Sequence, residues 1–242
     1  MTLFGPPPRW RQAIELPRAA WSVGELALAR RRLAGAPRGD GRAILVLPGL
    51  VNGDRSNFVL RGFLNRLGYR AYPWGLGRNF GRRAIGGEGE RLIARIEAIV
   101  AETGAPLTLI GVSLGGMMAR FVAHRRPDLV REVITVSSPF AGAPRDTNVW
   151  RTFEWLSGDR IDSARVRDWA ADCAAPLTVP STAIWSRSDG LVNGLACHAP
   201  DQPGARHIEI RSGHIGVQLK PRVLLTIADI LAAAPILSES GT

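Results

Sequence analysis

Residues 107–116, with the sequence LTLIGVSLGG, constrain the fold of this chain more than any other segment. The first six form an apolar run, which is typical of a central parallel strand buried on both faces. The pattern G-x-S-x-G follows at Gly111, Ser113 and Gly115, and residues 117–124 then have the composition of a helix. We therefore predict a strand, a sharp turn at Ser113 and a helix, the setting in which a serine can act as a nucleophile.

The turn explains why small residues flank this serine. To stand clear of the sheet, the backbone of Ser113 must adopt a sparsely populated conformation, which costs about 1–3 kcal/mol. The residues two before and two after it crowd the neighbouring strand, so only very small side chains fit at Gly111 and Gly115. The motif alone is also compatible with an ordinary glycine-rich turn. The strand before it and the helix after it favour the nucleophile.

Strands and helices alternate along most of the chain. We predict strands at residues 43–47, 69–72, 107–112, 132–136, 180–185 and 207–210, and helices at 56–67, 88–102, 117–124 and 222–231. Such alternation predicts an α/β fold, with a mostly parallel sheet covered by helices on both faces. The length of 242 residues suits one domain of this class. We expect an α/β domain over residues 40–242, preceded by an extension over residues 1–39.

The N-terminal extension contains an amphipathic stretch. Residues 14–33 have helix-like apolar spacing, with Trp21, Leu26 and Leu28 among basic residues. Such a helix can be a lid, can lie on a membrane surface in transient contact, or can pack on the edge of the sheet. Packing on the sheet is the favoured interpretation.

No segment of the sequence indicates export or membrane insertion. No apolar run reaches the 18 residues that a membrane-spanning helix needs. Residues 6–8 are prolines, and Arg9, Arg11 and Glu15 interrupt any apolar region of a signal peptide. We therefore expect a cytoplasmic protein.

Residues 140–175 break the alternation, between the predicted strands at 132–136 and 180–185. They carry several aromatic and apolar side chains, namely Trp150, Phe153, Trp155, Leu156 and Trp169. An insertion at the carboxyl edge of the strands lies where open α/β sheets bind ligands. We expect a cap or lid whose aromatic side chains favour an apolar substrate. The alternative is that they pack a small core of the insertion itself.

A serine nucleophile needs a base within hydrogen-bonding reach. His124 lies about three turns along the helix after Ser113 and points away, and His198 and His207 lie near the start of a strand. His214, in the sequence RSGHIG, directly follows a strand and precedes the last helix. It therefore reaches the same edge of the sheet as Ser113, and we predict that it is the base.

The base needs an acid that orients it, and Asp189 has the matching position just past the preceding strand. The chain order is then Ser113, Asp189 and His214, which is the order of one class of serine hydrolase only. Asp146, after the earlier strand, is the second candidate. Asp189 and Gly190 are also compatible with an ordinary turn.

An oxyanion hole needs two backbone N–H groups directed at the developing negative charge. One should come from Leu114, the residue after the nucleophile, at the start of a helix whose dipole favours negative charge. The other should come from the loop after the first strand, where Gly49 permits close approach and Leu50 is the natural donor. The alternative for Pro48 and Gly49 is a simple turn.

The net charge of +10 does not by itself indicate a nucleic-acid partner. Lys220 is the only lysine, so the arginine excess resembles genome base composition. No run of five basic residues occurs, and aromatic residues do not alternate with basic ones. Cys173 and Cys197 lie far apart and in no metal-binding spacing, so free buried thiols are expected, with their pairing left open.

Together these motifs resemble the α/β-hydrolase superfamily. They are P-G-L at residues 48–50, G-V-S-L-G-G at 111–116, S-S-P-F at 137–140, S-D-G at 188–190 and S-G-H-I-G at 212–216. Within the superfamily the chain is similar to bacterial lipase- and esterase-like proteins related to triacylglycerol lipases and PGAP-like deacylases, over residues 43–232.

The resemblance implies an eight-stranded type of sheet, a cap insertion after the sixth strand, a Ser-His-Asp triad, no metal and no cofactor. The sequence departs from many lipases at Pro48, where they carry histidine before the oxyanion glycine, and this difference bears on the substrate more than on catalysis.

The function expected from these residues is hydrolysis of a small-molecule or lipid carboxylic ester through an acyl-enzyme. The same residues also serve acyl transfer to other acceptors. A protein of this fold that only binds ligands is the alternative from a different class, although such proteins usually lack a member of the triad. The acyl-chain length and the oligomeric state stay open.

Overall fold

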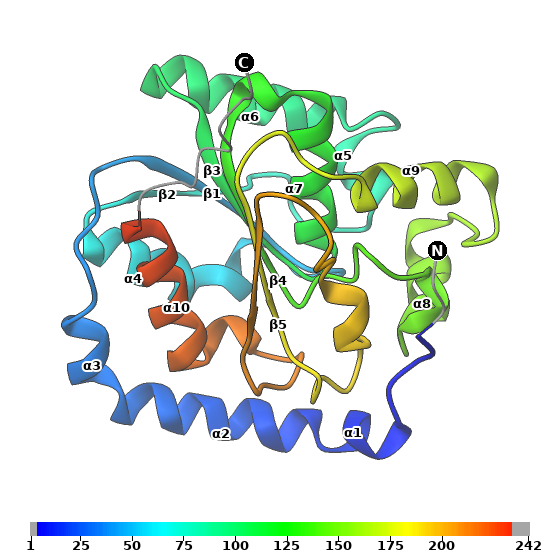
Figure 1. Ribbon diagram of the computed structural model, residues 1–242, viewed down its shortest axis with the longest axis horizontal. Coiled ribbons are helices and arrows are strands. Elements are labelled where there is room, and N and C mark those ends of the chain that lie inside the picture. Colours follow the sequence, from blue (N-terminus) through cyan, green and yellow to red (C-terminus); the bar gives the residue numbers. More distant parts are fainter. Residues whose placement is uncertain (1–3, 234–242) are drawn as a thin grey trace.

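The structure is a computed structural model that describes residues 4–233, so the ends of the predicted extension and domain (1–3 and 234–242) lie outside it. Its centre is a six-stranded sheet in the order β2-β1-β3-β4-β5-β6 (Figure 1). Every neighbouring pair is parallel. The strands are β1 Ala43–Leu47, β2 Arg70–Pro73, β3 Leu107–Val112, β4 Val130–Val136, β5 Ser181–Trp185 and β6 Ala205–Glu209. The predicted α/β class is therefore confirmed.

The number of strands differs from the expectation taken from the resemblance. The sheet has six strands within residues 4–233 instead of eight, and the insertion follows β4, the fourth strand, instead of a sixth. The reason lies before β1, where residues 9–34 form helices and no strand precedes Ala43 in the described chain. The segment contains a single β-branched valine and one isoleucine among arginines and alanines, which favours helix over strand.

Helices cover both faces of the sheet (Figure 1). Leu45 and Leu47 of β1 face a core formed with α6 and α7, whereas Ile44 and Val46 face a core formed with α4 and α10. This alternation follows from the two-residue period of a strand. The helices are α1 Arg9–Ala13, α2 Glu15–Leu28, α3 Arg30–Ala34, α4 Phe58–Leu67, α5 Arg82–Ile85, α6 Glu90–Thr103, α7 Leu114–Arg125, α8 Trp150–Ser157, α9 Ala164–Ala174 and α10 Pro221–Ala232.

Two predicted boundaries shift for local reasons. The helix predicted over 56–67 begins as a 3-10 turn, Asp54–Asn57, and becomes α-helical at Phe58. It ends at Gly68, whose φ of 105° is left-handed and releases the chain towards β2. β4 begins at Val130, two residues before the predicted strand, because Val130 pairs with Leu107 across a register shift.

The predicted insertion contains two helices, α8 and α9, beside the carboxyl ends of β3 and β4. Arg120 of α7, with only 1% of its side chain exposed, fixes the end of α9. Its guanidinium lies 3.9 Å above the ring of Phe140 and donates hydrogen bonds to the carbonyl oxygens of Cys173 and Ala175. A buried cation satisfied by carbonyl groups therefore joins the insertion to the helix that follows Ser113.

Both cysteines, Cys173 and Cys197, are free and buried, as expected.

Among the helices that the structure describes, none combines the length and the apolar character needed to cross a membrane.

Candidate active site

The turn at Ser113 has the strained geometry that the sequence predicts. Ser113 adopts φ 53° and ψ −122° between β3 and α7, a region that L-residues rarely occupy. A Cβ atom at Gly111 would collide with the backbone of Gly115 and Gly116, and one at Gly115 would collide with the carbonyl group of Leu47. The two glycines therefore let α7 begin directly against the sheet, which presents the Ser113 side chain at the strand ends.

The structure brings Ser113, His214 and Asp189 together. His214 Nε2 lies 3.0 Å from Ser113 Oγ, and His214 Nδ1 lies 2.8 Å from Asp189 Oδ2. Three loops supply these groups, after β3, β5 and β6, and all three lie at the carboxyl edge of the parallel sheet. This arrangement lets the imidazole accept a proton from the hydroxyl while the carboxylate holds the other ring nitrogen.

The environment of Asp189 fixes its orientation. Its side chain is 1% exposed, and its second oxygen, Oδ1, accepts N–H hydrogen bonds from Leu191 and Val192, both at 2.9 Å. The Asp189–Gly190 pair is therefore a turn as well as the partner of His214, since the turn holds the carboxylate in place. Both interpretations of this dipeptide describe the same structure.

The charges around His214 favour its protonated form. Burial lowers the pKa of His214, but the charge of Asp189, the hydrogen bond to it and the charge of Glu15 raise the pKa, and the net pKa lies above its usual value. A nearby negative charge stabilises an imidazolium. The site can therefore hold the proton that His214 would take from Ser113.

The other candidate residues lie elsewhere. Asp146 is fully buried, and its carboxylate accepts N–H hydrogen bonds from Phe4, Gly5 and Ala143, so it holds the N-terminal segment and does not contact His214. His198 and His207 have ring centroids 5.7 Å apart beside Trp185, and burial lowers the pKa of both. His124 is exposed on α7.

Leu50 and Leu114 both line the pocket that contains Ser113. Neither backbone N–H group donates a hydrogen bond to an acceptor within residues 4–233. A Cβ atom built on Gly49 would lie 3.2 Å from the Cβ atom of Ser113, so the loop after β1 approaches the serine closely. The two N–H groups are therefore available beside Ser113, at the positive end of α7.

Asn79, which no motif in the sequence indicates, holds this loop. Its side chain is fully buried and donates a 2.7 Å hydrogen bond to the carbonyl oxygen of Pro48. Its backbone carbonyl accepts a hydrogen bond from Val51, which has a left-handed φ of 59°. In the sequence, Asn79 is one asparagine within a stretch rich in glycine and arginine. Nothing in that stretch indicates that its side chain lies beside Pro48.

Glu15, the first residue of α2, is a second residue of the site that no motif in the sequence indicates. Its carboxylate is 1% exposed and accepts N–H hydrogen bonds from Gly190 at 2.8 Å, His214 at 2.7 Å and Ile215 at 2.9 Å. Arg18, one turn later, donates to the carbonyl oxygen of Ser188 at 2.7 Å. The N-terminal extension therefore joins the two loops that carry Asp189 and His214.

The pocket at Ser113 is mostly apolar. Its walls come from the insertion, from α7 and from the loops after β1, β4 and β5. The apolar side chains that line it include Leu50, Met117, Trp150, Phe153, Ile161 and Trp169. Trp155, also expected over the site, is 80% exposed and does not line the pocket. No group of three or more His, Cys, Asp or Glu side chains within the described chain is arranged to hold a metal ion.

Known proteins that are similar to this chain in sequence include lipases. A family model for the alpha/beta hydrolase fold matches residues 75–183. Triacylglycerol lipases of Pseudarthrobacter phenanthrenivorans and Burkholderia plantarii are each 43% identical to the chain over 58 residues, or 24% of its length. The match spans 18% and 16% of these two lipases, so the chain aligns with less than a fifth of the length of these curated relatives.

Solved structures are similar to this one over most of the chain. A monoacylglycerol lipase of Paleococcus ferrophilus has a TM-score of 0.60 at 16% identity, covering 81% of this chain and 96% of that one. A pyrethroid hydrolase of Sphingobium faniae JZ-2 has a TM-score of 0.58 at 16% identity, covering 79% and 98%. At such identity the likeness concerns the fold. The chain therefore has the α/β-hydrolase fold, and part of its sequence is similar to triacylglycerol lipases.

Proposed function

We propose that this chain is a serine hydrolase that cleaves carboxylic esters. The observation that carries the proposal is the continuous hydrogen-bonded series from Ser113 Oγ through the His214 ring to Asp189 Oδ2. The strained turn at Ser113, the free N–H groups beside it and the likeness to lipases support the same function. A protein that only bound ligands would have no use for a strained serine aligned with a base and an acid.

The proposed reaction has two halves. In the first, Ser113 Oγ attacks the acyl carbonyl carbon as His214 Nε2 takes the hydroxyl proton, and the N–H groups of Leu50 and Leu114 stabilise the oxyanion. The C–O bond to the alcohol then breaks, and His214 returns its proton to the leaving oxygen. In the second half, His214 removes a proton from water as the water oxygen attacks the acyl carbon, the bond between that carbon and Ser113 Oγ breaks, and His214 returns its proton to Ser113 Oγ as the acid is released.

The pocket favours an apolar acyl group of medium length. The aromatic and aliphatic side chains of α7, α8 and α9 would surround such a group beside Ser113. Each buried methylene contributes about 0.8 kcal/mol. Two to four additional methylenes should therefore raise kcat/KM by roughly 10- to 200-fold, if the gain is realised in the transition state.

Hydrolysis of p-nitrophenyl esters from acetate to octanoate tests both the reaction and this preference. We expect kcat/KM to rise with chain length before it levels off. A steady fall from acetate to octanoate would reject the apolar acyl pocket, and the absence of hydrolysis along the whole series would reject the ester hydrolase. Repeating the assay with an added alcohol separates acyl transfer, which yields a new ester, from hydrolysis, which yields the free acid.

Glu15 should act as a positioning residue within this mechanism. Glu15→Gln keeps the size of the side chain but removes a negative charge and one of the acceptor oxygens that bind Gly190, His214 and Ile215. We expect kcat/KM to fall by about tenfold or more because the two loops lose their common anchor. The charge of Glu15 raises the pKa of His214. Its removal should therefore lower that pKa and move the acidic limb of the pH–rate profile to lower pH.

Glu25→Gln is the matched control for this experiment. Glu25 is also on α2, but its carboxylate pairs with Lys220 at 3.0 Å and does not contact the loops of Asp189 and His214. Its pH–rate profile should match that of the unmodified chain. A Glu15→Gln profile that keeps its acidic limb while activity falls would indicate a purely structural role for Glu15.

A further inference from the structure

Helix α2 buries its polar side and exposes its apolar side. The residues turned towards the protein include Glu15, Arg18, Ser22 and Glu25, and two of these, Glu15 and Ser22, are the buried residues of the helix. None of the exposed residues carries a charge, and the indole N–H of Trp21 is their one polar side-chain group; they are Leu16, Pro17, Ala20, Trp21, Val23, Gly24, Ala27 and Leu28. A helix that packed only for the stability of its own domain would have the opposite orientation.

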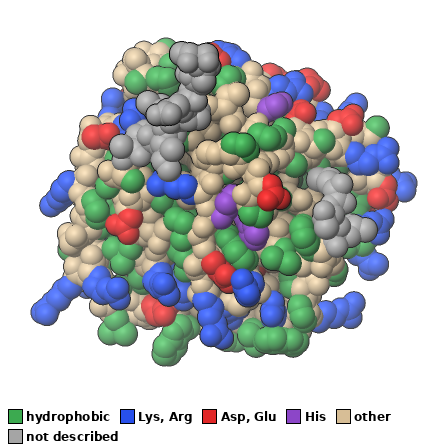
Figure 2. All heavy atoms as spheres, viewed as in Figure 1, with side chains coloured by type: hydrophobic (Ala, Val, Ile, Leu, Met, Phe, Trp, Pro, Cys, Tyr) green, Lys and Arg blue, Asp and Glu red, His purple; other side chains and the backbone are tan. Residues whose placement is uncertain are grey.

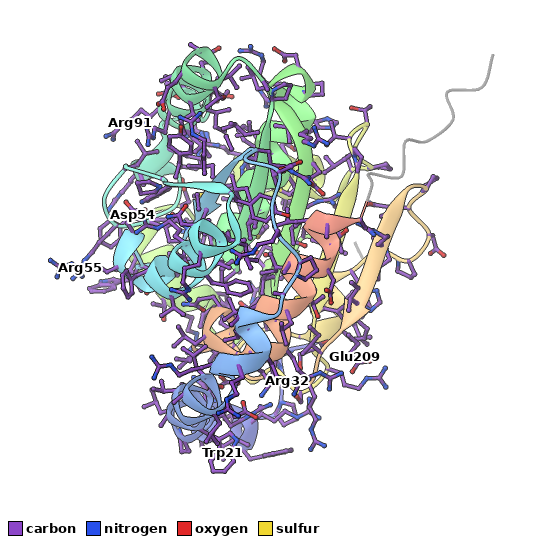
Figure 3. The ribbon with its side chains drawn as sticks, turned by 90° about the vertical axis from the view of Figure 1, so that its left-hand side faces the viewer. Trp21, Arg32, Asp54, Arg55, Arg91 and Glu209 are labelled. Atoms are coloured by element: carbon purple, nitrogen blue, oxygen red, sulfur yellow. The ribbon has the colours of Figure 1, made fainter. Side chains whose placement is uncertain are left out.

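The apolar surface is extensive. Leu16 is 70% exposed, Trp21 72%, Val23 56% and Leu28 90%. Trp10 on α1 adds an indole ring that is 62% exposed. Figure 3 shows Trp21 at the outer edge of the molecule, directed away from the sheet. Contiguous apolar surface of this kind marks an interaction site, whereas single exposed apolar residues do not.

The polar contacts of α2 prevent it from rotating about its own axis. Glu15 and Arg18 hold the loops of Asp189 and His214 by the hydrogen bonds described above, and Lys220 holds Glu25. Rotation of α2 to bury its apolar side would break all of these contacts and leave the loop N–H groups without partners. The outward apolar side of α2 is therefore fixed by the loops on its inner side.

Arginines flank the apolar surface at both ends. Arg9 lies before it, and Arg30, Arg31 and Arg32 lie after it, all of them exposed. Residues 9–34 contain six arginines and two glutamates, and both glutamates are engaged on the inner side. Figure 2 shows hydrophobic and basic side chains gathered along the lower edge of the molecule, where Figure 1 places α1 and α2.

We propose that the outer surface of α1 and α2, with the flanking arginines, binds the surface of an anionic lipid bilayer. An interfacial helix presents an apolar side that includes tryptophan, together with basic residues that meet anionic headgroups. Indole rings prefer the boundary between headgroups and acyl chains, which suits Trp10 and Trp21. The sequence favours packing on the edge of the sheet, but the inner side of α2 packs instead on α10 and on the loops after β5 and β6, and its outer side packs on nothing in the described chain.

A second copy of the chain fits this surface less well. Whether two α2 helices packed parallel or antiparallel, the arginines at the ends of one would face arginines of the other. The exposed outer side of α2 offers no carboxylate to pair with them. Like charges at such an interface are repulsive, whereas an anionic bilayer supplies the opposite charge over the whole area.

Co-sedimentation of the full chain with lipid vesicles tests the proposal, and it does not depend on ester hydrolysis. Vesicles of phosphatidylcholine with phosphatidylglycerol should bind the chain, and vesicles of phosphatidylcholine alone should bind it far more weakly. Trp21→Glu/Leu28→Glu should reduce binding to the anionic vesicles by at least about tenfold. Trp155→Glu/Leu195→Glu makes the same exchanges at exposed positions outside α2 and should leave binding unchanged.

A second variant keeps the apolar surface and removes charge. Arg30→Ser/Arg31→Ser/Arg32→Ser should weaken binding by about 100-fold, since each arginine near an anionic surface contributes about fivefold. Arg91→Ser/Arg131→Ser/Arg167→Ser removes the same charge from exposed positions elsewhere and should have a much smaller effect. Figure 3 places Arg91 at the end of the molecule opposite Trp21.

The possible results distinguish an anionic bilayer from a second copy of the chain as the occupant of this surface. Equal vesicle binding by the α2 variants and their controls would overturn the proposal. So would a chain that binds no vesicle but forms a dimer, by analytical ultracentrifugation, that Trp21→Glu/Leu28→Glu dissociates, because the occupant would then be a second copy. Loss of vesicle binding in both α2 variants, with thermal unfolding like that of their control variants, would support it.

Discussion

Replacing Ser113 by alanine should reduce kcat for ester hydrolysis by about 10⁵- to 10⁶-fold, and replacing His214 by alanine should have an effect of the same size. The two residues are 3.0 Å apart and would act as one unit, so the double variant should be hardly worse than either single variant. Initial rates on the best p-nitrophenyl ester, measured for the three variants, check this result.

The alanine at position 113 should leave the stability of the protein nearly unchanged. Alanine keeps the left-handed φ of 53° and its strain, and the half-buried hydroxyl that it removes makes one hydrogen bond, to His214. Thermal unfolding should therefore show no large loss of stability. A loss of activity below about tenfold in a folded variant would exclude Ser113 as the nucleophile.

A fluorophosphonate probe gives a second measurement of the same assignment. The unmodified chain should gain the mass of one adduct, on Ser113, and Ser113→Ala should gain none. His214→Ala should react far more slowly because its serine lacks a base. An adduct on another residue would show that the hydrogen-bonded series at Ser113 is not the reactive centre.

Much of the fold could be predicted from the sequence because its signals are local. The four inner strands, β1, β3, β4 and β5, are mostly apolar and buried, and the helix after Ser113 follows directly from the turn. The positions of Ser113, Asp189 and His214 could be predicted as well. In a parallel sheet, residues that directly follow different strands meet at one edge, so chain position determines place in space.

The remaining parts of the site depend on contacts between distant segments. Glu15 lies 175 residues from Gly190, and Asn79 lies 31 residues from Pro48. Their roles are set by burial and by hydrogen bonds to backbone groups, which no pattern of residue types reveals. The inverted orientation of α2 also depends on contacts with distant segments. The apolar spacing of α2 predicts a helix, but it does not predict which side of the helix faces the protein.

Asp189→Asn should lower kcat by up to about 10⁴-fold at neutral pH while the structure stays intact. Asparagine has nearly the same shape, so its oxygen can still accept the N–H groups of Leu191 and Val192. Its amide nitrogen would then face His214 Nδ1 and favour the tautomer that carries the proton on Nε2, which cannot accept the proton of Ser113.

The pH dependence and a matched variant make this prediction specific. The charge of Asp189 raises the pKa of His214, so its loss should lower that pKa and move the acidic limb of the pH–rate profile to lower pH. Asp146→Asn makes the same exchange at a buried carboxylate that binds the backbone of Phe4, Gly5 and Ala143. It should lower stability and leave that limb in place. If Asp146→Asn abolished turnover in a folded protein and Asp189→Asn did not, the acid would have been assigned to the wrong residue.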